Sequence, residues 1–510
     1  MLNIVVFSLY LIFIYYIGFK GYQRVKTAED LIVAGWSMPL SVVTGSLIAA
    51  LLAAPFFFAA VGSGYTSGGF EGSATMGGLG TCMILGALIW TKPLRRLRGW
   101  TLADYYGLRY GSKKLGAYTG IVMAIAFGVF NAGALTVGGT YIIQTLLQID
   151  FLPAALLFVS LTALYSVIGG LWAVAYTEVV QGTLAIAGIL GITIFIMFYY
   201  PDITFNPEWW NISELFNKGG VEFWTLYLVL ALGDIPAVDL GQRVAAAKSP
   251  RVAQKSMIIA GIVIIAISWM PGMLGEAFKT IYPNSSNPET LMLAFAQGYF
   301  PPLLSAIFLT AMAAMGMSTV AACYVATSGI MTKNIYLDFI NKNPDPKKLL
   351  LFSRIMILVS AVLGFVLAVS AQKVIDLAYL AWDIIFVTIF WPIVLGPFWK
   401  RVSTPAVWAS ISVGLVYYIV TSLTHVPGPK IESDGFIGLL SELWLIPGFS
   451  GVVISGITIV VVSLIIPPTQ HVLDMHKIEK DKSLDEVGSR VEIKTTDNQI
   501  DKLQKNVKMN

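Results

Sequence analysis

SLIAALLAAPFFFAAVGSGY, residues 46–65, and LALGDIPAVDLGQR, residues 230–243, are long apolar stretches that helix-breaking residues interrupt. The first has Pro55 near its middle, and the second has Gly and Pro residues on either side of Asp234. A membrane helix tolerates such a break only where protein or water satisfies the released backbone groups. We therefore expect two broken transmembrane helices that border a binding site near the bilayer midplane.

The composition is that of a membrane protein. Of the 510 residues, 56% are hydrophobic and only 12% are charged, and the mean hydropathy is +0.75. The core of a soluble protein does not bury so much apolar surface, so a soluble multidomain enzyme is excluded. Both cysteines lie in apolar stretches and the three histidines lie in or beyond loops, so neither a disulfide framework nor a buried metal cluster is expected. These residues are Cys82, Cys323, His425, His471 and His476.

The apolar stretches predict an all-α polytopic membrane protein with thirteen transmembrane helices. A bilayer core of about 30 Å needs roughly 20 apolar residues per helix. Thirteen stretches meet this length, and we number them in chain order. They are residues 2–19, 39–61, 74–92, 115–146, 152–172, 177–199, 223–241, 254–275, 302–331, 350–370, 375–398, 405–424 and 447–466.

The basic residues predict the orientation. With the N-terminus outside, most Lys and Arg residues fall in cytoplasmic loops, as the positive-inside rule requires. The richest of these loops is TKPLRRLRGWTLADYYGLRYGSKK, residues 91–114, which we expect to set the topology and contact lipid head groups. Residues 1–466 then form the transmembrane domain. Residues 467–510 form a charged cytoplasmic tail, partly helical or disordered, with no nucleic-acid function.

The two broken spans indicate an internal repeat. They are spans 2 and 7, and an offset of five spans reverses the orientation of the second unit relative to the first. Spans 2–6 and 7–11, about residues 39–199 and 223–424, are therefore interpreted as two inverted five-helix repeats. A proline kink that serves helix packing alone is the alternative interpretation of each break.

Glu178, Asp234, Asp239 and Asp383 lie within the predicted spans, and no Lys or Arg lies deep in any of them. An interior with only acids favours a cation, whether an inorganic ion, a proton or a charged solute. Asp239 has an ordinary alternative in an i,i+4 pair with Arg243, and Glu178 has one as the cap of span 6. For Asp234 and Asp383, a structural hydrogen bond and a functional role are both open.

Span 9 carries adjacent hydroxyls, Ser318 and Thr319, among small residues. Hydroxyl and carbonyl oxygens beside a helix break are suitable ligands for a small alkali cation. The alternative is that these hydroxyls bond the carbonyls of their own helix, as Ser and Thr often do in membranes.

Four motifs resemble the sodium:solute symporter family. They are GGLWAVAYTEVVQG (169–182), MSTVAACYVATSGIMTKNIY (317–336), the SLIAA to GSGY stretch (46–65) and QRVAAAKS (242–249). The resemblance implies a core of two inverted repeats and Na⁺ as the coupling ion. It also implies that Glu178 attracts or relays sodium on the cytoplasmic side. The sodium ligands that it implies are the carbonyls of Ala49, Leu52 and Met315 and the hydroxyls of Ser318 and Thr319.

Within that family, GDIPAVDLGQRV (233–244) resembles the choline transporters, and Asp383 also falls where those members have an acid. The aromatic positions of the choline site are Asn131 and Ala237 here, which weakens the case for choline itself. Many members have polar or acidic side chains in the break of span 2, where this chain has apolar ones. A second sodium site and a sugar-type pocket are therefore not expected. The apolar residues are Leu51, Ala53, Pro55 and Phe56.

We interpret the chain as a sodium-coupled symporter of the cell membrane that imports a small organic solute by alternating access. The acids and phenylalanines favour an amine, ammonium or amino-acid-like solute. A monocarboxylate or a sugar, and a solute-sensing receptor of the same fold, are the alternatives. A channel is disfavoured by the apolar breaks, and no catalytic set for an enzyme is present. The expected solute-binding residues are Pro55, Phe56, Phe57, Gly78, Asn131, Asp234 and Asp383.

Overall fold

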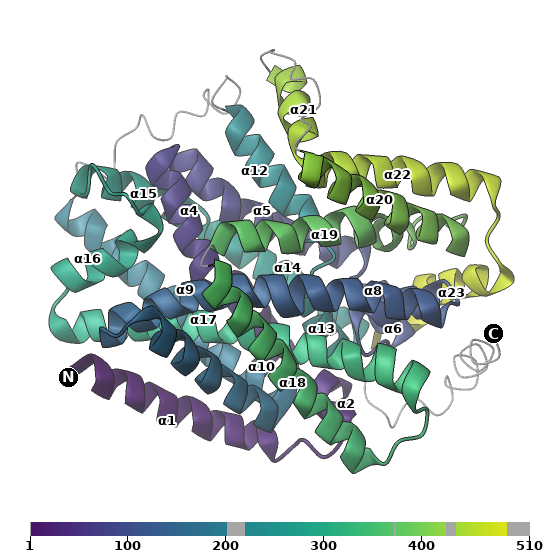
Figure 1. The fold of residues 1–510 in the computed structure, drawn as a ribbon, viewed down its shortest axis with the longest axis horizontal. Coiled ribbons are helices and arrows are strands. Elements are labelled where there is room, and N and C mark those ends of the chain that lie inside the picture. The colour runs from purple at the N-terminus through teal and green to yellow at the C-terminus, as the bar shows by residue number, and fades with distance from the viewer. Residues whose placement is uncertain (1, 201–219, 372–373, 425–434, 487–510) are drawn as a thin grey trace.

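The computed structural model describes residues 2–200, 220–371, 374–424 and 435–486. Within these residues the secondary structure is helical, apart from one isolated bridge between Met38 and Ala247. This confirms the predicted all-α class (Figure 1).

The first half of the chain forms long helices with several short helices between them. They are α1 (Leu2–Tyr22), α2 (Ala28–Val33), the 3-10 helix η1 (Ala34–Trp36), α3 (Leu40–Leu51), α4 (Ala54–Thr66), α5 (Gly69–Ile89), α6 (Thr91–Leu97), α7 (Leu102–Arg109), α8 (Lys113–Ile125), the π-helix η2 (Ala126–Asn131), α9 (Ala132–Leu147) and α10 (Phe151–Tyr199).

The second half continues in the same way. Its helices are α12 (Gly220–Gly233), α13 (Val238–Ala246), α14 (Pro250–Ile267), α15 (Trp269–Ile281), η5 (Pro288–Thr290), α16 (Leu291–Tyr299), α17 (Pro302–Ile330), the π-helix η6 (Met331–Ile340), α18 (Pro346–Ala371), α19 (Val374–Leu395), α20 (Thr404–Thr424), α21 (Gly435–Leu445), α22 (Pro447–Ile465), α23 (Gln470–Lys480) and η7 (Lys482–Glu486).

Both predicted helix breaks are present. Helices α3 and α4 meet at 47°, and α12 and α13 meet at 45°. Pro55 lies in the first turn of α4, where a proline costs nothing because the first N–H groups of a helix have no partner within it. A third interruption lies within α10 at Gly170, whose φ of 51° and ψ of −146° are not helical. A Cβ at Gly170 would lie 2.5 Å from the carbonyl oxygen of Leu31, so only glycine fits there.

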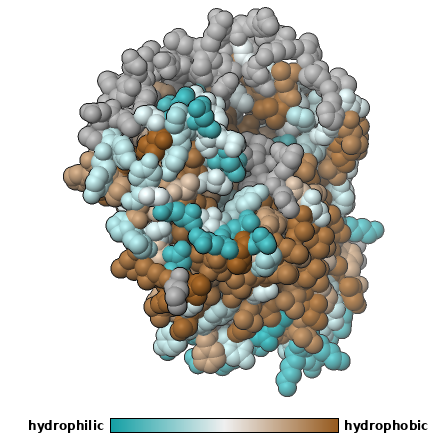
Figure 2. Space-filling view, turned by 60° about the vertical axis from the view of Figure 1, so that its left-hand side comes forward, coloured by the Kyte–Doolittle hydropathy of each residue, from teal (hydrophilic) through white to brown (hydrophobic). Residues whose placement is uncertain are grey.

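Nine described helices or helix runs are long and apolar enough to cross a membrane, and eleven if each bent pair counts as one span. Apolar side chains cover a broad area of the face in Figure 2. Helix α17 is buried along nearly its whole length and contacts α3, α4, α9, α10, α13 and α18. It therefore lies at the centre of the fold, where it meets both halves of the first bent pair and α13 of the second.

Candidate functional site

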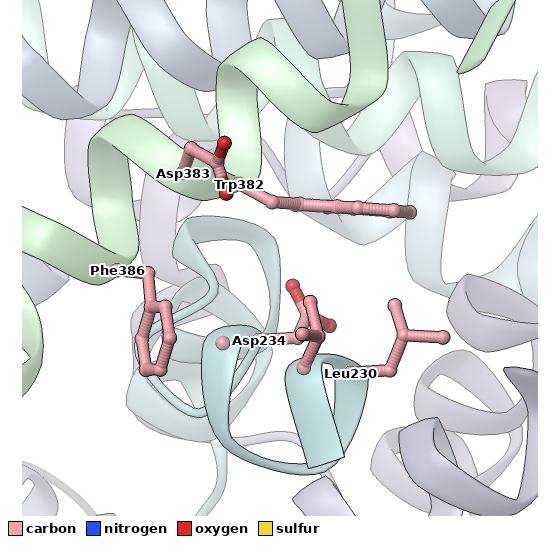
Figure 3. A pocket seen from close by; sticks show the side chains of 7 residues that line it. Leu230, Asp234, Trp382, Asp383 and Phe386 are labelled. Atoms are coloured by element: carbon pink, nitrogen blue, oxygen red, sulfur yellow. The ribbon is translucent and has the colours of Figure 1, made fainter. Parts of the chain in front are cut away.

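A small pocket lies between the end of α12 and the middle of α19. The open space between its lining residues, solvent included, is about 230 Å³, and its wall is apolar with two carboxylates. Figure 3 shows the ring of Trp382 over the space into which the Asp234 side chain points, with Phe386 and Leu230 on either side. The lining residues are Val229, Leu230, Gly233, Asp234, Trp382, Asp383 and Phe386.

Asp234 is the pocket residue whose carboxylate has no partner among the described residues. It directly follows the last residue of α12 and is only 7% exposed. Its backbone carbonyl accepts a hydrogen bond from the N–H of Ala237, so the break positions the residue. Within the described part of the chain, its carboxylate has neither an ion-pair partner nor a side-chain hydrogen bond. A buried carboxylate of this kind attracts a cation, because an uncompensated charge is costly in a low-dielectric site.

Asp383 differs from Asp234 although it lines the same pocket. Its carboxylate accepts a hydrogen bond from the Tyr418 hydroxyl on α20. It also lies against the first turn of α22, where a Cβ at Gly448 would come within 2.0 Å of Oδ1. The positive end of a helix dipole favours a carboxylate at this place. The protein itself therefore holds Asp383, and its role in solute binding stays a prediction.

The sequence analysis missed two aromatic residues of the pocket. Trp382 and Phe386 lie at i and i+4 on α19 and flank Asp383 in the sequence. The signal was present as AWDIIF, but aromatic residues in an apolar span usually belong to the core. The ring of Phe56 on α4 lies 4.9 Å from that of Trp382, so the break between α3 and α4 reaches the pocket wall through this contact.

The other predicted pocket residues lie behind the pocket wall or away from it. A Cβ at Gly138 would lie 2.4 Å from Pro55 Cγ, so Pro55 packs against α9. Gly78 lies against α12, where a Cβ would come within 2.9 Å of the Leu230 side chain. Asn131 Nδ2 lies 3.5 Å from the Cys323 sulfur, and Phe57 is fully buried. None of these four is among the pocket-lining residues.

The end of α3 contacts α17, the helix that carries Ser318 and Thr319. The Thr319 hydroxyl donates to the carbonyl of Ala50 at 3.4 Å, and so turns to α3 rather than to its own helix. The Ser318 hydroxyl is fully buried and has no hydrogen-bond partner in the described residues. Helix α3 ends at Leu51, and the last carbonyls of a helix lack partners within it. Ala49, Leu52 and Met315 are also buried.

A buried network of charged side chains joins α3, α10 and α13. Arg243, 1% exposed, forms ion pairs with Glu178 and Asp239, the latter at 2.9 Å. Ser46 donates to Glu178 and accepts from Arg243 Nε at 2.9 Å. The i,i+4 pair of Asp239 and Arg243 is thus confirmed. The prediction of an interior with only acids was wrong, because α13 carries Arg243 inward among them.

The alternative interpretation of Glu178 as the cap of span 6 does not hold. The chain turns at Gly170, and Glu178 lies well inside the helical segment that follows. Its carboxylate instead joins α10 to α3 and α13 through Ser46 and Arg243. The network has one positive and two negative groups, so a negative charge remains in it.

A model of the sodium:solute symporter family matches residues 31–414. The chain belongs to the sodium:solute symporter family. It is therefore a multi-pass membrane transporter that couples the movement of a small solute to sodium, and it is not an enzyme. The predicted family and the predicted coupling ion are confirmed.

The symporter is similar to transporters with different named solutes. A sodium/proline symporter of Haemophilus influenzae is 26% identical over 509 residues, which cover 94% of this chain and 98% of the relative. A high-affinity choline transporter of Torpedo marmorata is 27% identical over 410 residues, 74% of this chain and 68% of the relative. The solved structure of a sodium-coupled sialic acid symporter, substrate-bound and outward-open, has a TM-score of 0.74 at 18% identity. It covers 92% of this chain and 99% of that one, which shows a shared fold.

Proposed function

We propose that this symporter imports a small solute with a cationic centre, either an amine or ammonium compound or an amino acid. The observation that carries the proposal is the Asp234 carboxylate, which is buried, has no basic partner among the described residues and faces Trp382. An acid supplies charge and an aromatic face supplies a cation–π contact, and the two together recognise an amine or ammonium group.

An amino acid also fits this arrangement. Its ammonium group would meet Asp234, while its carboxylate would meet the bound sodium or the N-terminus of α4 or α13, where unpaired N–H groups favour an anion. A sugar fits less well, because the pocket wall offers few hydrogen-bonding groups apart from the two carboxylates. A monocarboxylate without an amine would be repelled by Asp234. The similarity to both a proline and a choline transporter supports a solute with a positive group.

Sodium would bind between α3 and α17, at the carbonyls of Ala49, Leu52 and Met315 and the hydroxyls of Ser318 and Thr319. This site joins a bent helix to the central helix, so bound sodium would favour one arrangement of the two. Solute binding at the second break would then favour closure, and opening to the cytoplasm would release both. Glu178 would accept the departing sodium on the cytoplasmic side.

The proposed architecture is thirteen transmembrane helices in the cell membrane, with the N-terminus outside. Its core would be the two inverted repeats, residues 39–199 and 223–424, and residues 467–510 would be cytoplasmic. Two described helices support a larger number of membrane spans than a count of long apolar helices gives. Helix α10 has 49 residues and breaks at Gly170, and α19 contains an apolar helical part at Leu380–Leu395.

The test is a thermal-stability screen of the purified protein with choline, proline, lactate and glucose, each in sodium and in potassium. A ligand at 100 times its Kd stabilises the folded state by about 2.7 kcal/mol, so binding appears as a rise in Tm. We expect choline or proline to raise the Tm, and to do so more in sodium. Stabilisation by lactate or glucose alone would exclude the proposed solute class.

A sensor of the same fold would bind the solute without moving it. Uptake of the stabilising compound into proteoliposomes, driven by an inward sodium gradient, separates the two functions. Binding without sodium-dependent uptake would favour the sensor.

A further inference from the structure

The C-terminal segment, residues 470–486, is docked on other helices rather than extended into solvent. It consists of α23 and η7. Helix α23 contacts α6 and α7, and η7 contacts α6 and α14 (Figure 1). The charged tail was expected to be partly helical or disordered, and its described part is helical and packed. We call residues 470–486 the tail segment.

The first anchor of the tail segment is a buried ion pair. Glu479 Oε2 lies 2.7 Å from Arg109 Nε, and both side chains are completely buried. The Tyr105 hydroxyl donates to Glu479 Oε1 at 2.8 Å, and Arg109 Nη1 donates to the carbonyl of Val472 at 2.7 Å. Removing one partner of such a pair leaves an uncompensated buried charge, so this contact holds the segment firmly.

The second anchor is Asp485, which binds two cations of α6. Its Oδ2 lies 2.8 Å from Lys92 Nζ, and its Oδ1 accepts from Arg96 Nε at 3.0 Å. Burial alone would raise the pKa of Asp485, but the hydrogen bonds from Lys92 and Arg96 hold it below its usual value. Basic residues of the 91–114 loop thus pair with tail acids, instead of serving only topology and lipid contact as predicted.

Arg109 carries this contact onward to α19. Its Nη2 donates to the carbonyl of Gly396 at 3.0 Å, directly after the end of α19. Two more residues of α7 and its C-terminal end hold the same region of α19, because the Tyr106 hydroxyl donates to the carbonyl of Ile389 and the Tyr110 hydroxyl to that of Pro392. Helix α19 also supplies Trp382 and Phe386 to the pocket, and both precede Ile389 on the helix. The tail segment, α7 and the pocket wall therefore form one connected chain of contacts.

We propose that the tail segment is a latch that fixes the cytoplasmic end of α19 through Arg109 and restrains the opening of the pocket toward the cytoplasm. The inference rests on the alternating access proposed above. Opening requires the pocket wall to move. The cytoplasmic end of α19 can move only if the three hydrogen bonds that its carbonyls accept from Tyr106, Arg109 and Tyr110 shift. The latch slows this step while Glu479 and Asp485 are in place.

The contacts of the latch suit release as well as attachment. They are mainly charged, and its described buried apolar side chains are only Val472, Met475 and Leu484. The Lys92 side chain at the second anchor is 25% exposed, so water reaches that edge. Order–disorder transitions of a docked segment are a common form of switch, and release here requires breaking the buried Arg109–Glu479 pair.

The experiment measures backbone hydrogen–deuterium exchange of the full chain in lipid nanodiscs, without solute. The variants are Glu479→Gln and Asp485→Asn, and the matched control is Asp474→Asn. Asp474 is a more exposed acid of α23, and its hydrogen-bond partners among the described residues, Gln470 and Lys477, lie within that helix. We expect Glu479→Gln to raise exchange in residues 382–396 by roughly tenfold or more, because local opening depends on such contacts. Asp485→Asn should raise it less, and the control should match the wild type.

Asp485→Asn keeps the test valid if Glu479→Gln does not fold. Equal exchange in residues 382–396 of the folded variants and the control, with loosening confined to residues 470–486, would overturn the latch. Exchange is measured without transport, so this result is independent of whether the proposed solute class is right.

Discussion

At the scale of single residues, the two pocket acids have opposite environments. Asp383 is held by Tyr418 and the first turn of α22, whereas Asp234 has no such partner among the described residues. A carboxylate that the protein leaves uncompensated is the one that a cationic ligand can compensate. The two positions are thus a natural pair of variant and control within one pocket.

Asp234→Asn removes this charge without changing the size of the side chain. We expect binding of a cationic solute to weaken by about 2–3 kcal/mol, or roughly 100-fold, because the negative charge that faces its cationic centre is lost, together with a hydrogen bond where that centre carries an N–H group. Isothermal titration with the compound found in the thermal screen gives the Kd. Asp383→Asn should change the Kd much less and mainly lower the Tm. Equal losses of affinity at both positions would contradict the assignment of Asp234.

Ser318 allows a second residue-scale test. Its hydroxyl is buried and has no hydrogen-bond partner in the part of the chain that the structure describes, so Ser318→Ala removes a proposed sodium ligand without removing a hydrogen bond seen in the structure. We expect a large rise in the sodium concentration needed for half-maximal uptake, and loss of sodium-dependent uptake when Thr319→Ala is added. Ser328→Ala is the control, since that hydroxyl on the same helix donates to the carbonyl of Ser353 at 2.6 Å. Undiminished sodium dependence of the double variant would exclude the site.

At the scale of elements, the charge network joins three helices from both proposed repeats. Arg243 of α13 meets Glu178 of α10 and Ser46 of α3, and the hydrogen bonds are buried throughout. The network therefore ties together the ends of the two bent pairs on one side of the sodium region. Its stability bears on how easily that side opens.

We expect Arg243→Gln to destabilise the protein by about 3–5 kcal/mol, since Glu178 and Asp239 are left as buried charges without a partner. Adding Glu178→Gln should restore part of this loss, because one uncompensated charge disappears. Thermal or denaturant unfolding of the two single variants and the double variant gives the coupling energy. Additive losses would show that Arg243 and Glu178 do not interact.

The helices and their breaks were predictable because their causes are local. Pro55 and the Gly and Pro residues beside Asp234 interrupt apolar runs, and the structure bends at both places. The i,i+4 pair of Asp239 and Arg243 was predictable, but the pairs Arg243–Glu178 and Arg109–Glu479 were not, because their members are far apart in the sequence and only the packing brings them together. Trp382 was missed for a different reason, since nothing in an apolar span distinguishes a pocket aromatic from a core aromatic. Local chemistry predicted the elements, and long-range packing decided which charges meet.

At the scale of the whole molecule, the proposed inverted repeats require a definite sidedness. The loop after the first bent pair and the loop after the second lie five spans apart, so they must face opposite sides of the membrane. Ser67 lies in the first loop and Lys248 in the second, and both residues are exposed. The native cysteines, Cys82 and Cys323, are both buried, which gives a low background for thiol labelling.

We expect Ser67→Cys to react with a membrane-impermeant maleimide added to intact cells, and Lys248→Cys to react only after the membrane is opened. The reason is that the basic residues favour the cytoplasmic side for the loop with Lys248. The measurement is the labelled fraction of each variant before and after permeabilisation, with the wild type as the control for the buried thiols. Labelling of both from the same side would contradict the inverted repeat. The reverse pattern would keep the repeat and invert the predicted orientation.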